Sequence, residues 1–393
     1  MKIHGIAIGL SVCSFLALWP AQSATAQPHF VGKQYPSERA TVENNQSGYE
    51  VIQWSRTGNN NHLYFNIESF IDADHFMFYS DRSGSMNLFR MNMLDGSATQ
   101  MTDEDSLTQS VWHLPQYHRL WFLAGSALKV LNTETLETHL VYAFGSSKPE
   151  SFAITCDGRY CVFSANKNPG FSPSHSTGPY ALFRLDLDTK KVKQISPDLG
   201  FKIGHVQSSP IDPAIVTYCW QHVYVDGAPG IVGNTPNRIW WNRVDGTDGG
   251  PVGTQEFGLH RTHEFWFPDG KHIGYSARYH FGPLKGSQFI GITTPDGNEN
   301  FMMPAPVSSS HNQMYSDNRH WVSDLYDGNN LVLFTIDGKE IAQTEILSNH
   351  GSSMVGQPTH PHPHFSPNGR YILFSTDRSG RPQVYTLRVN IKD

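Results

Sequence analysis

The chain has 393 residues, of which 38% are hydrophobic and 12% aromatic. This length supports a large buried core, either as two ordinary domains or as one large repeat-built domain. The formal net charge is −6, and the basic residues are scattered along the chain. Without a basic stripe or a like-charge block, the composition argues against a nucleic-acid-binding surface and against a long disordered tail.

The first 26 residues have the features of a secretory signal peptide. Lys2 gives a short positive region, Ile6 to Trp19 is largely apolar, and Ala24 to Ala26 is a small-residue cleavage pattern. The apolar run is short for a membrane span, and no later stretch is long and apolar enough to cross a bilayer. We therefore expect residues 27–393 to form one mature domain that is periplasmic or secreted, with an uncleaved membrane anchor as the alternative.

A degenerate repeat occupies most of the remaining chain. Its clearest unit begins at Phe365 and contains an Asn-Gly turn, an apolar strand, an Asp-Arg-Ser-Gly turn and a second strand. Such turns beside alternating apolar residues are typical of β-hairpins. In chain order the units span Ile71 to Thr102, Tyr117 to Tyr142, Ile154 to Ser196, Ser209 to Val252, Phe265 to Met303, Met314 to Leu347 and Phe365 to Val389.

The spacing of these units, roughly 40 to 55 residues, is that of propeller blades. We predict an all-β fold, a seven-bladed β-propeller with four-stranded antiparallel blades. The unit that begins at Tyr117 is the weakest match. An unassigned strand at Glu50 to Arg56 is expected to complete the last blade and close the ring. Helices should be few, because no segment has a sustained apolar period of 3.6 residues.

Three cysteines remain after the predicted signal peptide. Cys156 and Cys161 flank an Asp-Gly turn, so they could form a disulfide across a hairpin or stay as two thiols. Cys219 would then be unpaired and is expected in the core.

The chain has twenty histidines, and several of them lie where loops lead into the innermost strands of the predicted blades. These loops line one mouth of a propeller channel, so residues distant in sequence should converge there. The positions are His62, His205, His263, His311 and the segment from Gln357 to His364.

The pattern Gln357-x-x-His360-x-His362 indicates a metal site. In an extended segment, residues two apart share a face, and the alternating prolines stiffen that geometry. Imidazoles with an amide oxygen suit Mn, Zn, Fe or Ni better than Ca. His364 alternates in phase as well, so the pattern leaves open which two of the three histidines bind, and a surface His/Pro loop is the alternative.

Three further residues have expected roles at or beside this metal site. His263 is a natural fourth ligand, although it could be a core histidine. Strand alternation would then point Glu264 away from the site. Arg238, beside two tryptophans, could bind an anion or lie on a blade surface.

Several of these motifs resemble those of the oligogalacturonate lyases. They are Thr262-His-Glu-Phe-Trp-Phe-Pro-Asp-Gly270, Gly204-His205 followed by Pro210, Gln357-Pro-Thr-His-Pro-His362 and, less specifically, Asn61 to Phe65. The resemblance covers most of the mature chain. It implies a seven-bladed propeller that cleaves uronate sugars by β-elimination, as in pectin degradation, and leaves 4,5-unsaturated uronyl products.

The resemblance also implies a ligand set. A divalent ion, usually Mn²⁺, would be held by His263, Gln357, His360 and His362 and would contact the sugar carboxylate. Neutralising this carboxylate makes the neighbouring C5 proton easier to remove by a neutral histidine.

We expect His205 to be that base. The family also carries a histidine soon after a cysteine on the next strand. Here the sequence departs, because His222 follows Cys219 two positions later than expected, and His222 could substitute as the base. Substrate binding is expected from His62, Arg238 and His311.

Two alternatives differ in substrate or in class. The predicted signal peptide departs from the best-known family members, which act in the cytoplasm, so the substrate could be ulvan or another uronate polysaccharide. The repeats also resemble those of TolB-like periplasmic interaction propellers, which are not enzymes. Five histidines at one mouth favour the enzyme. The Gly-x-Ser-x-Gly motif that would indicate a hydrolase does not occur in the sequence. The expected partner is an acidic oligo- or polysaccharide rather than a nucleic acid.

Overall fold

The structure is a computed structural model that describes residues 30–42, 48–145, 148–168, 179–221, 237–256, 258–325 and 328–391. The predicted signal peptide, residues 1–26, lies outside these ranges and stays a prediction.

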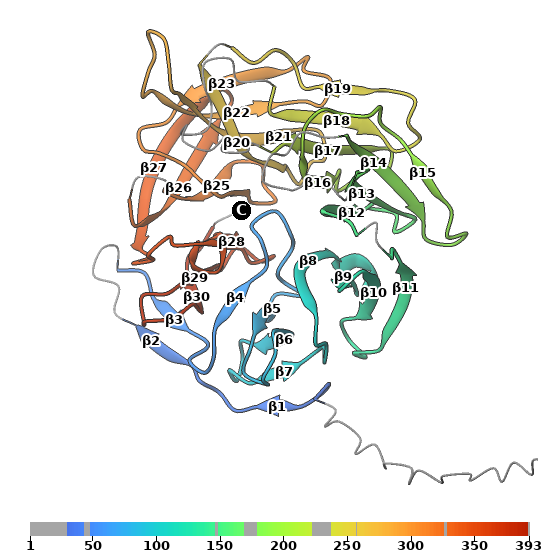
Figure 1. The fold of residues 1–393 in the computed structure, drawn as a ribbon. Coiled ribbons are helices and arrows are strands. Elements are labelled where there is room, and N and C mark those ends of the chain that lie inside the picture. The colour runs from blue at the N-terminus through green and yellow to red at the C-terminus, as the bar shows by residue number, and fades with distance from the viewer. Residues whose placement is uncertain are drawn as a thin grey trace, which may run out of the picture.

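Seven antiparallel sheets surround a central channel and confirm the predicted seven-bladed β-propeller (Figure 1). The blade that contains the weakest repeat unit is complete and consists of β8 to β11. With strands in order from the channel outward, the first three blades are β4 (Asn60–His62), β5 (His75–Ser80), β6 (Asn87–Asn92) and β7 (Ala98–Gln100); β8 (Leu107–Leu114), β9 (Arg119–Ala124), β10 (Ala127–Asn132) and β11 (Thr138–Ala143); and β12 (Ser151–Ile154), β13 (Tyr160–Asn166), β14 (Tyr180–Asp186) and β15 (Val192–Gln194). The next three are β16 (Ile203–Ser208), β17 (Ile215–Trp220), β18 (Ile239–Arg243) and β19 (Gly249–Pro251); β20 (Leu259–Trp266), β21 (Ile273–Tyr279), β22 (Gln288–Thr293) and β23 (Asn300–Pro304); and β24 (Asn312–Met314), β25 (His320–Asp324), β26 (Asn330–Asp337) and β27 (Glu340–Asn349). The last blade consists of β28 (His364–Phe365), β29 (Tyr371–Thr376) and β30 (Gln383–Arg388), followed by β3 (Val51–Gln53) and β2 (Ala40–Val42).

The ring is closed by strand pairing between the two ends of the chain. As predicted, the N-terminal strand β3 adds to the last blade, where it pairs antiparallel with β30. Two further strands were not predicted. β2 extends the same sheet beyond β3, and β1 (Gln34–Tyr35) pairs with β7 of the first blade. Because β1, β2 and β3 join two neighbouring blades, the junction between them is covered by the N-terminal segment.

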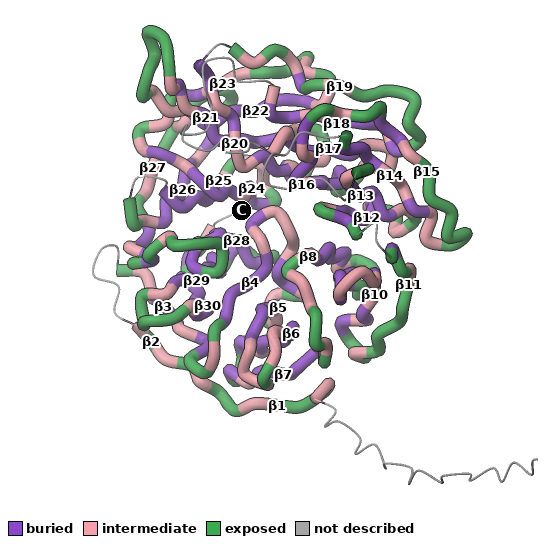
Figure 2. The backbone as a smooth tube through the Cα atoms, viewed as in Figure 1, coloured by how far each residue is buried: buried purple, intermediate pink, exposed green. Residues whose placement is uncertain are grey.

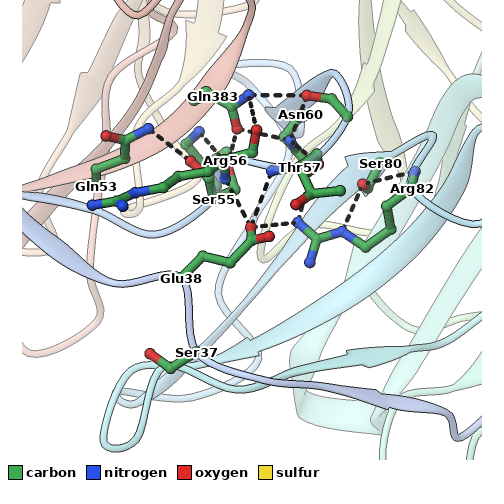
Figure 3. Close-up of polar contacts among 12 residues, drawn as sticks. Ser37, Glu38, Gln53, Ser55, Arg56, Thr57, Asn60, Ser80, Arg82 and Gln383 are labelled. Carbon is green, nitrogen blue, oxygen red and sulfur yellow. Dashed lines mark hydrogen bonds and ion pairs between the residues drawn. The ribbon is translucent and has the colours of Figure 1, made fainter.

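A buried glutamine of β30 reinforces this closure (Figure 3). The Oε1 atom of Gln383 accepts hydrogen bonds from Ser55 Oγ at 2.6 Å and from Asn60 Nδ2 at 2.8 Å. Its Nε2 atom donates to the carbonyl oxygen of Gly58 at 2.9 Å. Nearby, Glu38 accepts a hydrogen bond from the backbone of Arg56. The amide of one side chain thus ties the last blade to the first.

The apolar core lies between neighbouring blades rather than within each one. Phe265 and Ile290 of one blade pack in the same cluster as Trp321 and Phe334 of the next. Figure 2 shows buried residues on the inner strands and exposed residues towards the rim, as on β11 and β15. A blade cannot bury both of its faces alone, so blade stacking provides the burial.

Helical structure is limited to short turns in the described part of the chain, as predicted. The helical segments are η1 (Pro115–Tyr117) and η3 (Gln357–Thr359), and both are 3₁₀ turns. None of the helices in the described ranges has the length and apolar character needed to span a bilayer.

The three described cysteines are all free thiols. The hairpin disulfide between Cys156 and Cys161, one of two alternatives from the sequence, is therefore not formed, and Cys161 is buried in β13 instead. Cys219 is fully buried, as expected for a core residue.

The closure predicts a specific loss of stability in Gln383→Ala. Removing this amide leaves the buried hydroxyl of Ser55 without its acceptor and takes one of three acceptors from Asn60, which should lower the free energy of unfolding by about 2 kcal/mol. Urea denaturation followed by circular dichroism would measure this. Gln343→Ala, at an exposed position of β27, is the matched control and should change stability little. Equal stability of the two variants would contradict the role given to Gln383.

Candidate metal centre and its neighbouring pocket

Irregular backbone at the innermost strands aims three histidines into the channel. β16 has a register shift between Gly204 and Gln207, and β20 has one between Thr262 and Phe265. His205 and His263 lie inside these β-bulges with φ of 46° and 52°, and His362 has a φ of 48°. Such left-handed backbone is uncommon outside glycine, although histidine is among the residues that tolerate it. Bulges re-aim side chains and often occur beside active sites.

The His-rich segment before the last blade is not an extended strand. Gln357 to Thr359 form a 3₁₀ turn, His360 is extended, and His362 is left-handed. We expected His360 and His362 to share a face because of strand alternation, and this reason was wrong. The turn and the left-handed residue nevertheless bring the two rings to 5.7 Å between centroids.

His311 lies at the centre of the cluster. Its ring centroid is 4.2 Å from that of His362 and 5.2 Å from that of His360. One ring nitrogen from each of these three residues lies within 4.8 Å of the other two, so the three could bind one metal ion. His360 Nδ1 and His362 Nε2 are buried and make no hydrogen bond to a described protein group. We refer to His311, His360 and His362 as the histidine trio.

A buried carboxylate holds the trio in place. Asp324, at the end of β25, accepts hydrogen bonds at 2.8 Å from both the backbone nitrogen and the Nδ1 atom of His311. Its Oδ2 atom also lies 3.4 Å from the backbone nitrogen of His362. Burial alone would raise the pKa of Asp324, but His311 outweighs this effect and the pKa is lowered. Asp324 therefore fixes Nδ1 as the protonated nitrogen of His311 and leaves Nε2 for a metal, a common arrangement in metal sites.

Two predicted ligands lie beside the trio. The ring centroid of His263 is 4.4 Å from that of His311, but His263 is not one of the three residues that come together most closely. Burial, followed by the neighbouring His311, holds the pKa of His263 well below its usual value, so its ring is neutral at pH 7. Gln357 is exposed and lines a pocket together with His362.

This pocket, which we call the site pocket, has a volume of about 270 Å³. Its lining includes residues in the N-terminal halves of innermost strands, such as Gln109 of β8 and His205 of β16. It also includes Tyr64 of the segment after β4, and this segment reaches into the middle of the ring (Figure 1). Four residues predicted from the sequence meet there with four others. Its lining residues are Asn61, His62, Tyr64, Tyr79, Gln109, His205, Gln357 and His362.

His62 has no ring nitrogen left for a substrate. Its Nδ1 and Nε2 atoms each make a 2.7 Å hydrogen bond, to Ser375 Oγ and to the carbonyl oxygen of His362. Burial lowers the pKa of His62 to about 3, so the ring stays neutral. The structure therefore gives His62 a role in holding the backbone of His362, whereas the sequence suggested substrate contact.

A second buried carboxylate joins His205 and Arg238. Glu264 is fully buried, and its two oxygens lie 2.7 Å from His205 Nδ1 and 3.1 Å from Arg238 Nε. Burial alone would raise the pKa of Glu264, but Arg238 and His205 outweigh it, and the pKa is held below its usual range. The expectation that Glu264 points away from the site is wrong, because the bulge in β20 removes the regular alternation. Arg238 is buried as well, which excludes a blade-surface position.

His205 is oriented for chemistry at its other nitrogen. Since Glu264 accepts a hydrogen bond from Nδ1, Nε2 is the ring nitrogen that is left to accept a proton. Nε2 lies 3.4 Å from the hydroxyl group of Tyr64 and lines the site pocket. The ring of Tyr64 in turn lies 4.8 Å from that of His362, so it separates His205 from the trio. The other predicted base, His222, lies outside the described residues.

His205, Cys219 and Glu264 also lie close enough to one another to hold a metal ion. Their chemistry argues against one, because the guanidinium of Arg238 already neutralises Glu264. Burial also raises the pKa of the Cys219 thiol well above its usual value.

The sequence reasoning missed Asp324, Glu264 and Tyr64. Asp324 could have been found as an acidic residue at the end of an apolar strand, in the repeat unit that directly follows His311. Glu264 directly follows a predicted ligand and was named but assigned away from the site. Tyr64 had no signal beyond its place near His62.

Comparisons with known proteins identify the family of the chain. The family model described as oligogalacturonate lyase matches residues 171–392, more than half of the chain. An oligogalacturonate lyase of Dickeya dadantii is 29% identical over 241 residues, which cover 56% of this chain and 58% of that protein. An oligogalacturonide lyase of Pectobacterium atrosepticum is 24% identical over 395 residues, covering 91% and 98%. The chain thus spans just over half of the first relative and nearly all of the second.

Solved structures share the fold. A structure described as an oligogalacturonate lyase in complex with manganese has a TM-score of 0.81 and 23% identity, and covers 92% of this chain and 98% of its own. The oligogalacturonate lyase of Vibrio parahaemolyticus has a TM-score of 0.80 and 22% identity, covering 91% and 98%. These likenesses establish the common propeller architecture. With the match of the family model to more than half of the sequence, the chain belongs to the oligogalacturonate lyase family.

Proposed function

We propose that this lyase cleaves oligogalacturonate by metal-dependent β-elimination and releases products with a 4,5-unsaturated uronyl end. The observation that carries this proposal is the histidine trio beside a pocket that contains a histidine oriented by a buried carboxylate, in a chain of this family. Family membership already makes the chain an enzyme, so the alternative of a non-enzymatic interaction propeller is set aside.

The described residues fit a divalent metal ion. His311, His360 and His362 supply nitrogen ligands, and two of their buried ring nitrogens make no hydrogen bond to a described protein group. The amide oxygen of Gln357 is the remaining predicted ligand that lies at the site pocket. Nitrogen donors with an amide oxygen suit Mn²⁺, and a related structure is described as a manganese complex. When bound, such an ion would neutralise a carboxylate and so make the neighbouring C–H group more acidic.

Arg238 is a candidate for hydrogen bonding to the substrate carboxylate, with its charge already balanced by Glu264. Its Nε atom donates to Glu264, and a guanidinium group has further N–H donors in a planar fork that matches a carboxylate. Because Glu264 is buried between Arg238 and His205, it sets the positions of both groups at once. The chain thereby places an anion-binding group and a proton acceptor on one rigid support.

Two histidines qualify as the base that removes the C5 proton. His205 has an Nε2 lone pair at the site pocket and a proton on Nδ1 fixed by Glu264, and it is our first candidate. His263 is the second candidate, because it is nearest to the trio without being part of it and its lowered pKa keeps it neutral. A neutral imidazole can accept a proton, and the 4-O-glycosidic bond then breaks by elimination without water.

We further propose that the enzyme acts in the periplasm or outside the cell. This rests on the predicted signal peptide at residues 1–26. The same feature favours a second substrate candidate, ulvan or another uronate polysaccharide, because an exported enzyme meets polymers that have not been degraded.

The reaction class can be tested with the purified protein. Digalacturonate, polygalacturonate and ulvan are incubated separately, with Mn²⁺ and with a chelator, and the unsaturated product is followed by its ultraviolet absorbance. We expect product from digalacturonate in the presence of Mn²⁺ and loss of activity with the chelator. Product from ulvan alone would select the second substrate. No product from any of the three would contradict the proposed reaction.

The role of Asp324 can be tested by Asp324→Asn. Loss of the charge behind His311 should weaken Mn²⁺ binding about 10- to 100-fold, as measured by calorimetry. Asp317→Asn is the matched control, because Asp317 pairs with His320 at the other end of β25 and lies away from the trio. Metal affinity that is unchanged in folded Asp324→Asn, or equally reduced in the control, would contradict the role.

The base can be assigned by comparing His205→Ala with His263→Ala at saturating Mn²⁺. We expect the variant that lacks the base to lose about 100- to 10,000-fold in kcat while it keeps its metal affinity. The first candidate predicts this result for His205→Ala, and the opposite result would assign the base to His263. A loss of less than about tenfold in both variants would exclude both histidines.

A further inference from the structure

β-Elimination on a uronate needs a third group besides the metal ion and the base. When the C4–O bond breaks, its electron pair stays on the oxygen of the departing sugar, and a sugar alkoxide is a poor leaving group. A positioned acid that protonates such an oxygen contributes about 10²–10⁴-fold to the rate. C5, which loses its proton, is bonded both to the carboxylate carbon and to C4. The acid must therefore lie close to the metal centre and to the base.

The lining of the site pocket offers few groups that can donate a proton. Among the described lining residues, Tyr64 and Tyr79 carry hydroxyl groups. The hydroxyl of Tyr79 is buried without a partner among the described groups, so a substrate does not reach it. Both ring nitrogens of His62 are engaged in hydrogen bonds. The amide side chains of the lining do not transfer protons, and this leaves the hydroxyl of Tyr64.

Tyr64 is held between His205 and the histidine trio. It belongs to the segment after β4, which reaches into the middle of the ring (Figure 1). Its neighbours in sequence, Leu63 and Phe65, are fully buried, whereas Tyr64 itself is half-buried. Its ring centroid lies 4.8 Å from that of His362 and 5.6 Å from that of His205. The segment is thus anchored on both sides of a side chain that stays partly accessible.

The hydroxyl of Tyr64 is connected to a buried carboxylate through His205. It lies 3.4 Å from Nε2 of His205, and Nδ1 of the same ring lies 2.7 Å from Glu264. A distance of 3.4 Å is long for a hydrogen bond, so a substrate oxygen can replace this contact at little cost. Catalytic hydrogen bonds are often long before the substrate binds. Because Glu264 engages Nδ1, Nε2 is the nitrogen through which His205 can exchange a proton with Tyr64.

We propose that Tyr64 is the catalytic acid that protonates the leaving glycosidic oxygen, an inference that rests on the proposed lyase function. The base takes the C5 proton, and the electron pair of the C5–H bond forms the C4=C5 double bond. The C4–O bond breaks, and its oxygen takes the proton of the Tyr64 hydroxyl. With His205 as the base, its Nε2 returns the C5 proton to the Tyr64 phenolate. With His263 as the base, solvent restores both groups.

Tyr64→Phe tests this role, because it removes the hydroxyl and keeps the ring. At saturating Mn²⁺ with digalacturonate, we expect the full-length variant to lose about 100- to 10,000-fold in kcat. Its Mn²⁺ affinity, measured by calorimetry, should stay unchanged. Tyr218→Phe is the matched control, since Tyr218 is a buried tyrosine of β17 that does not line the site pocket, and it should keep the wild-type kcat.

A second substrate distinguishes an acid from a hydroxyl that only supports the site. A galacturonate that carries 4-nitrophenol in ether linkage at C4 releases nitrophenolate, which leaves without a proton. On this substrate we expect Tyr64→Phe to lose less than about tenfold in kcat relative to the wild type. The release is followed by the colour of nitrophenolate.

Three results would overturn the proposal while they leave the lyase function intact. The first is a loss in Tyr64→Phe that is equal on the two substrates. The second is a loss of less than about tenfold on digalacturonate. The third is weakened Mn²⁺ binding in the folded variant, which would make Tyr64 a support of the metal centre. A wild-type protein that forms no product from digalacturonate would instead contradict the proposed function itself, and this inference with it.

Discussion

The candidate site depends on left-handed backbone at three histidines of the channel. His205, His263 and His362 each have a φ near 50°, a conformation that costs of order 1 kcal/mol or more for a residue with a side chain. Regular strands would send alternate side chains into the blade interior and away from one another. The ring of blades, closed by β3 and by Gln383, supplies the packing that holds the chain in this conformation. The histidines converge because the fold overrides their local preference.

Two buried carboxylates then determine which nitrogen of each histidine is available. Asp324 fixes the proton on Nδ1 of His311, and Glu264 does the same for His205. Each carboxylate stays ionised because its partners outweigh the cost of burial. The Nε2 atom of His311 is therefore available beside the other two histidines of the trio. The Nε2 atom of His205 is available at the site pocket. One carboxylate serves the proposed metal binding, and the other serves the proposed proton transfer and the orientation of Arg238.

The architecture could be predicted from the sequence because its signals are local and repeated. The Asp-Gly and Asn-Gly turns and the blade spacing were enough for seven blades, including the weak unit that begins at Tyr117. The extra strands β1 and β2 could not be predicted, since each has only two or three residues, and β1 pairs with a strand distant in sequence.

The sequence pointed to several histidines of the candidate site, but not to their geometry or to the carboxylates that hold them. His360 and His362 were expected together and are together, yet through a 3₁₀ turn and a left-handed residue rather than an extended segment. The bulge in β20 reversed the expected direction of Glu264, and His311 lies inside the trio while His263 lies beside it. Bulges and ring contacts between blades arise from tertiary packing, which a single sequence pattern does not encode.

X-ray absorption spectroscopy of the Mn²⁺-loaded full-length protein tests the central claim most directly, because it observes the ligands themselves. The account predicts imidazole scattering from about three histidines together with oxygen ligands, and loss of part of that scattering in His311→Ala. A first shell made only of oxygen, or one that His311→Ala leaves unchanged, would contradict a metal centre built on this trio.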